Sequence, residues 1–165
     1  MTIRKIKIEE FDKLFDLFPD GVELWKKYRE KRIKELSNNE TATYVIEDND
    51  KFIGEISVNY VSHDLPTEAI PNRRVYLQTY RVDKKYQKFG LGQQLLQFVL
   101  NDLENAGYTE FTIGVEDNNE IARHIYFKYG FTEAIDKGHG GVFDPTDYTL
   151  YMRSIEKSKG EEHGI

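Results

Sequence analysis

A strand-like run that turns through two glycines directly into a helical pattern defines the middle of this chain. The run is VYLQTYRV (75–82), and it is followed by a short polar link and the stretch QKFGLG (87–92). Apolar residues then recur at helical spacing at 91, 95, 96, 99 and 103, up to a terminating Gly107. Such a junction is either a tight helix-capping turn or a backbone cradle for a phosphate group.

The flanking segments alternate between strand and helix patterns. Strands are predicted at 2–8, 44–47, 52–61, 75–82, 110–115, 131–136 and 147–155, and helices over 9–18, 22–36, 91–103 and 119–130. Asn49 and Asp50 form the turn of the first hairpin, and the proline-containing segment 62–74 has no periodicity. The order β-α-α-β-β-β-α-β-α-β-β predicts an α+β protein with a mixed sheet.

Composition narrows the function classes. The 165 residues suit one domain, which we place at 1–155 with a polar tail at 156–165. The absence of cysteine excludes disulfides, cysteine-ligated metals and thiol nucleophiles. A net charge of −6 disfavours nucleic acid as a partner and is compatible with a cationic substrate. No signal peptide or membrane-length apolar run is seen, so we expect a cytoplasmic protein without a membrane partner.

The physics of helix ends favours the phosphate cradle. The first N–H groups of a helix lack intrahelical partners and carry partial positive charge. Gly90 and Gly92 let the backbone approach a ligand closely, and Lys84, Lys85 and Lys88 add positive charge. A dinucleotide fingerprint is excluded because Leu95 stands where its third glycine belongs, and a P-loop motif is absent. On spacing alone the capping turn stays open.

Two motifs, taken together, resemble those of one enzyme family. Q-x-x-G-x-G occurs at 87–92, and N-x-x-A-x-x-x-Y-x-x-x-G-F occurs at 119–131. Both are similar to signatures of the GNAT superfamily of N-acetyltransferases, and the order of elements resembles that family over nearly the whole chain. The resemblance implies a mostly antiparallel sheet flanked by helices, in which parallel strands 75–82 and 110–115 splay apart to form a cofactor cleft.

The resemblance implies acetyl-CoA as the acetyl donor and requires no metal. The backbone of Tyr80, Arg81 and Val82 would pair with the pantetheine arm. The pyrophosphate would be held by backbone N–H groups in the motif, and Asn119 would contact the cofactor from the other wall. The motif residues implied are Gln87, Lys88, Phe89, Gly90, Leu91, Gly92 and Gln93.

By the same resemblance Tyr126 is the general acid that protonates the departing thiolate; the alternative is a core aromatic residue. The general base is less defined. Strand 75–82 offers Tyr76, Gln78 and Tyr80 on one face but no acid, which puts a base there in doubt. Glu55 on the adjacent strand is the candidate, and a solvated strand glutamate, a water chain and an amine that arrives neutral are the alternatives.

The acceptor implied is a small-molecule amine or a protein amino group. The segments that select acceptors in this family contain Trp25, Tyr28, His63, Asp64, Glu68 and His139, although Trp25 and Tyr28 also suit the core and His139 an exposed turn. The competing function is a catalytically silent acyl-CoA-binding regulatory module. Dimers are common in such proteins, so a homodimer is a further expectation, but the sequence shows no interface.

Overall fold

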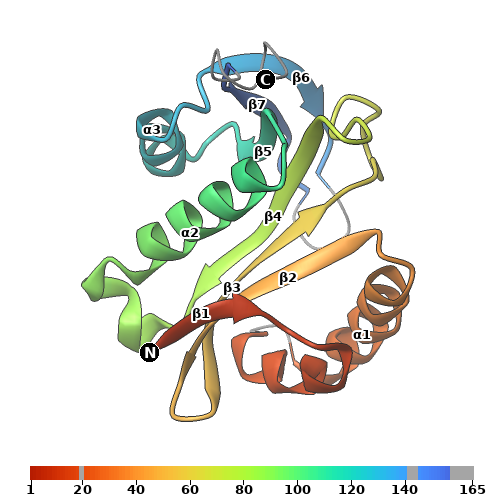
Figure 1. The fold of residues 1–165 in the computed structure, drawn as a ribbon, viewed down its shortest axis with the longest axis vertical. Coiled ribbons are helices and arrows are strands. Elements are labelled where there is room, and N and C mark those ends of the chain that lie inside the picture. Colours follow the sequence, from red (N-terminus) through yellow and green to blue (C-terminus); the bar gives the residue numbers. More distant parts are fainter. Residues whose placement is uncertain (19–20, 141–144, 157–165) are drawn as a thin grey trace, which may run out of the picture. The chain divides into compact units, whose positions relative to one another are not determined.

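A computed structural model describes residues 1–18, 21–140 and 145–156, with only the backbone described at Lys88. The predicted tail at 156–165 therefore lies almost wholly outside the described residues. The predicted order of elements is confirmed, with one extra 3₁₀ helix that begins before the glycine motif and includes its first three residues (Figure 1). The elements are β1 (Thr2–Lys5), η1 (Ile8–Leu17), α1 (Val22–Ser37), β2 (Thr41–Asp48), β3 (Lys51–Asn59), β4 (Arg74–Val82), η2 (Lys84–Phe89), α2 (Leu91–Asn105), β5 (Glu110–Glu116), α3 (Glu120–Lys128), β6 (Glu133–Gly138) and β7 (Tyr148–Ser154).

The strands form one sheet in the order β1-β2-β3-β4-β5-β7-β6, which is mostly antiparallel with one parallel pair. This confirms the predicted fold class. The chain divides into a first unit, residues 1–60 and 77–103, and a second unit, residues 61–76 and 104–165. Strand β4 belongs to both, because the boundary falls between Tyr76 and Leu77.

In the first unit, β1, β2 and β3 pair antiparallel. The β2–β3 hairpin turns at Asn49 and Asp50, whose φ values of 49° and 65° are those of a turn that matches the twist of the strands. Its core gathers aromatic side chains from η1 and α1 against this hairpin. Trp25 stacks on Phe11 at 5.4 Å between ring centroids, and Tyr28 packs against the same cluster. The core interpretation of Trp25 and Tyr28 is therefore confirmed.

The first predicted helix is a 3₁₀ helix, η1, rather than an α-helix. Its buried residues are Phe11, Leu14 and Leu17, which are three apart. Side chains at i and i+3 align in a 3₁₀ helix, so this winding places all three on the core. Phe15, which an α-helical stripe would bury with them, is 37% exposed.

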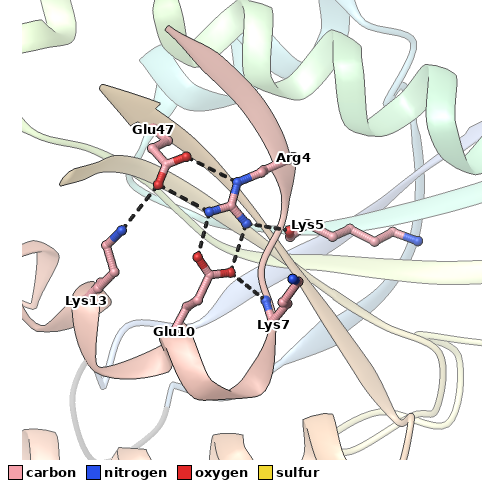
Figure 2. Close-up of polar contacts among 6 residues, drawn as sticks. All are labelled: Arg4, Lys5, Lys7, Glu10, Lys13 and Glu47. Carbon is pink, nitrogen blue, oxygen red and sulfur yellow. Dashed lines mark hydrogen bonds and ion pairs between the residues drawn. The ribbon is translucent and has the colours of Figure 1, made fainter. Parts of the chain in front are cut away.

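A charged network ties the first strand to its neighbours (Figure 2). The Arg4 guanidinium donates to both oxygens of Glu10 at 2.8 and 2.6 Å and to Glu47 of β2 at 3.2 Å. Lys13 donates to Glu47 at 3.2 Å, and its ammonium lies 4.5 Å from the centre of the Phe52 ring. The network thus joins β1, η1 and β2 through one arginine.

In the second unit, β7 pairs antiparallel with both β5 and β6. The start of β4 is joined to β5, because the carbonyl of Arg73 accepts from the N–H groups of Thr109 and Glu110. Phe111 and Phe131 are fully buried here. Gly130, with φ of 90°, ends α3 where the sequence predicts.

Candidate functional site

The glycine motif lies between the end of β4 and the start of α2, as predicted. Asp83 caps η2 by accepting from the N–H of Lys85 at 3.0 Å. The Gln87 side chain donates to the carbonyl of Val82 at 2.9 Å, so in this structure it braces the turn. Gly90 adopts φ of 68°, a left-handed conformation that favours glycine. The turn is thus built by side-chain caps and one glycine conformation.

The second glycine is required for a different reason. A Cβ atom on Gly92 would lie 2.9 Å from the Tyr80 hydroxyl and 3.4 Å from Cγ2 of Val82. The helix therefore starts in contact with the strand. The first bond at this end of α2 runs from the N–H of Gln94 to the carbonyl of Gly90, so the N–H groups of Leu91 and Gly92 precede it. This end fits an anion such as a pyrophosphate.

Strand β4 changes character at Thr79. Its φ of 53° is rare for a β-branched residue and marks local strain. Before it Val75 and Leu77 alternate inward, whereas Tyr80, Arg81 and Val82 are all partly exposed. These three are the residues expected to pair with pantetheine, and that role stays a prediction. Nothing in the sequence signalled Thr79, since glycine or asparagine is the usual residue at such a φ.

Glu55 is buried and paired, so the expectation of a solvated strand glutamate is wrong. It is 1% exposed on β3, where it contacts Arg32 of α1 at 3.0 Å and Arg81 of β4 at 3.2 Å. The two guanidinium groups offset the cost of burying the carboxylate. They engage both of its oxygens, which supports a structural role; the role of general base stays a prediction.

The other two predicted site residues lie on α3 in the second unit. Asn119 is the N-cap of this helix and accepts from the N–H of Ala122 at 3.0 Å. It lines a pocket of about 420 Å³ together with Arg123 and Lys137. Burial raises the pKa of the Tyr126 phenol to about 12, so the hydroxyl keeps its proton at neutral pH. Its ring packs edge-to-face on Phe131 at 6.2 Å, which fits the core-aromatic interpretation, and the role of general acid stays a prediction.

The predicted residues therefore fall into two sets. Glu55, the end of β4 and the glycine motif belong to the first unit, and Asn119 and Tyr126 belong to the second. Phe89 within the motif is 68% exposed. The predicted splaying of β4 from β5 stays a prediction.

Tyr148 was missed by sequence reasoning, and Tyr76 was noted without a role. Both lie against Gly114 of β5: a Cβ there would come within 3.2 Å of the Tyr76 hydroxyl and 3.0 Å of Cδ2 of Tyr148. A glycine inside a strand often marks a close approach of this kind, so Gly114 was the available signal. His139 has a 94% exposed side chain, which confirms the exposed-turn interpretation.

Among the described residues, no cluster of histidine and acidic side chains is arranged to hold a metal ion. Within the same residues, no helix has both the length and the apolar composition that a membrane span needs.

Comparison with known proteins agrees with the two motifs. Residues 7–131 match the profile of the acetyltransferase (GNAT) family. N-alpha-acetyltransferase 50 of Danio rerio is 26% identical over 140 residues, which cover 74% of this chain and 83% of that protein.

Two solved structures share the fold. One is a GNAT family acetyltransferase from Elizabethkingia anophelis with acetyl-CoA bound, with a TM-score of 0.65 at 20% identity over 93% of this chain and 97% of that one. The other is the ribosomal-protein-S18-alanine N-acetyltransferase of Escherichia coli, with a TM-score of 0.69 at 17% identity over 95% of each chain.

Proposed function

This chain belongs to the acetyltransferase (GNAT) family and is an acyltransferase, and we propose that it transfers the acetyl group of acetyl-CoA to a primary amine by direct attack. The β4–α2 junction carries the proposal. The left-handed Gly90 and the N–H groups of Leu91 and Gly92 suit a pyrophosphate, which acetyl-CoA contains. The acetyl-CoA bound to the E. anophelis relative supports the same donor.

The acceptor is an amino group, and the relatives favour one on a protein. The D. rerio protein is named as an N-alpha-acetyltransferase, and the E. coli structure is named for an alanine of ribosomal protein S18. A small-molecule amine is the alternative acceptor. We also propose that residues 1–155 act as one acetyltransferase domain.

The reaction requires two proton transfers, one to the departing thiolate and one from the attacking amine. Acetyl-CoA supplies an acetyl thioester. Tyr126 holds a proton on its hydroxyl at pH 7, gives it to the departing thiolate and regains a proton from solvent. The amine must lose a proton before or during attack. Because arginines engage both oxygens of Glu55, we favour transfer of that proton to water.

Calorimetric titration with acetyl-CoA, CoA and NAD tests the donor, followed by an acetylation screen of peptides and small amines. We expect binding of the two CoA species, no binding of NAD, and turnover with an amine. Binding of CoA species without turnover of any amine would favour the silent regulatory module. Failure to bind CoA would reduce the junction to a helix-capping turn.

A further inference from the structure

Glu68, in the segment before β4, has a buried carboxylate of which only one oxygen is hydrogen-bonded among the described residues. It is 0% exposed. Its Oε1 accepts from the N–H groups of His63 and Asp64 at 3.0 and 3.1 Å, and its backbone carbonyl accepts from the hydroxyl of Thr112 at 2.8 Å. Its Oε2 is buried without a hydrogen-bond partner among the described residues. Burying a charged oxygen without a partner costs free energy, so we expect a hydrogen-bond donor or a cation to bind at this atom.

Two phenols of the same unit lie on β4 and β7, the strands on either side of β5. The Tyr76 hydroxyl and the Tyr148 ring both approach Gly114, and a Cβ on Gly138 would lie 2.1 Å from Cζ of Tyr148. Gly114 and Gly138, which have no side chains, therefore leave the space that the two tyrosines occupy. Neither phenol donates to or accepts from another described residue. We call Glu68, Tyr76 and Tyr148 the acidic tyrosine site.

The charges around this site are negative. Burial first, and then the charges of Glu68, Asp64 and Asp136, raise the pKa of Tyr148 to about 12. Burial and the charge of Glu68 also raise the pKa of Tyr76 well above its usual value.

Two cations of the same unit, Arg74 and Lys137, are already paired. Arg74 donates to Glu110 at 2.9 Å and to the carbonyl of Thr67 at 2.9 Å. The Lys137 ammonium lies 3.5 Å from Asp117. The site thus combines hydroxyl groups with excess negative charge, which is the chemistry that binds ammonium groups.

We propose that the acidic tyrosine site binds the acetyl acceptor as a cation, and that it selects primary amines with a second positive charge close by. This inference rests on the proposed function. One ammonium group would leave two of the three carboxylates at 64, 68 and 136 uncompensated, whereas a dication would compensate more of this charge. A basic peptide N-terminus and a small diamine share this chemistry. Glu68 is a positioning residue that acts through its charge and through the two tyrosines.

The test compares matched acceptors. The peptide amides Ala-Lys-Ala and Ala-Glu-Ala differ in the residue next to the amine, which is positively charged in the first and negatively charged in the second, and 1,3-diaminopropane and propylamine form the small-molecule pair. We expect kcat/KM to favour the dicationic member of the preferred pair by about tenfold, and the preference to shrink in high salt. The better pair identifies the source of the acceptor.

Glu68→Gln keeps an acceptor oxygen for the N–H groups of His63 and Asp64 but removes the charge. We expect it to raise KM for the cationic acceptor about tenfold, with kcat and acetyl-CoA affinity little changed. Glu133→Gln, the same change at an exposed residue of β6, should leave all three unchanged. If Glu68→Gln does not fold, Tyr148→Phe keeps the ring and removes the hydroxyl, and KM should again rise.

Equilibrium binding of Ala-Lys-Ala amide to the CoA-loaded protein provides a readout independent of turnover. Binding that is lost in Glu68→Gln and kept in Glu133→Gln supports the site, even if no acetylation is found and the proposed function fails. Equal use and equal binding of the lysine and glutamate peptides would overturn the inference, even if both are acetylated. An unchanged preference in Glu68→Gln would overturn it as well.

Discussion

Tyr148 lies so close to Gly138 that a Cβ atom on this glycine would come within 2.1 Å of the tyrosine Cζ. The two residues are partners in the register of β7 and β6. Gly138 has no positive φ, so this glycine is required for space and not for its conformation.

Gly138→Ala should therefore displace the Tyr148 ring. Because the ring is the movable partner, we expect a folded protein whose free energy of unfolding, measured in urea, falls by about 1–3 kcal/mol. Gly138→Ala made in a Tyr148→Ala protein should lower the free energy of unfolding much less than it does in the wild type, since the clash is then removed. Additive effects of the two changes would show that the ring does not occupy this place.

Gly92→Glu should abolish acetyl-CoA binding, as measured by calorimetry. The new carboxylate would stand at the start of α2, where the N–H groups of Leu91 and Gly92 favour an anion. The control is Gly92→Gln, which brings the same clash with Tyr80 but no charge. Binding should be weaker in the glutamate variant than in the glutamine variant. Equal affinities would exclude charge at this position as a factor in binding.

Tyr126→Phe should lower kcat by about 100-fold and leave acetyl-CoA affinity unchanged, because only the transferable proton is removed. Its pKa of about 12 adds a second expectation. An acid with this pKa stays protonated up to about pH 11, so kcat should show no alkaline loss due to Tyr126 up to pH 9.5. Unchanged turnover in the variant would identify Tyr126 as a packing residue beside Phe131.

Glu55→Gln should destabilise the first unit by about 3–5 kcal/mol in urea unfolding, because Arg32 and Arg81 would lose their shared carboxylate. Glu30→Gln, at an exposed position of α1, is the control and should change stability little. The opposite pattern, a stable Glu55→Gln protein that binds acetyl-CoA but does not turn over, would establish Glu55 as the general base.

The ionisation of Glu10 should make the free energy of unfolding depend on pH in the acid range. Hydrogen bonds from Arg4, and then from the N–H of Lys7, lower the pKa of Glu10 from 4.5 to about 2. A carboxyl whose folded pKa is depressed stabilises the protein above its unfolded pKa, and this contribution is lost as the pH falls from about 5 to 2.

At pH 7 we expect Glu10→Gln to cost about 1 kcal/mol, a modest value because the pair is partly exposed. Near pH 2 wild type and variant should unfold at more similar urea concentrations. A difference that is the same at both pH values would show that the ionised Glu10 contributes nothing specific.

Local periodicity was sufficient for most of the fold. The helical stripe from Leu91 to Leu103 and the positive-φ turn at Asn49 and Asp50 are encoded within a few residues. The winding of η1 was mispredicted, because its i,i+3 pattern was interpreted as an α-helical stripe.

The candidate site was only partly accessible in this way. The burial of Glu55 depends on Arg32, 23 positions away, and the surface under Tyr148 depends on glycines in two other strands. Neither relationship has a local signature. The φ of 53° at Thr79 likewise contradicts the preference of its own residue type, so it has no local signature either.

The division of β4 between the two units bears on where the chain can be cut. Its first three residues belong to the second unit and the rest to the first. A break between Tyr76 and Leu77 would therefore leave each unit with a truncated strand, so neither unit should be obtained intact by cutting the chain at this boundary.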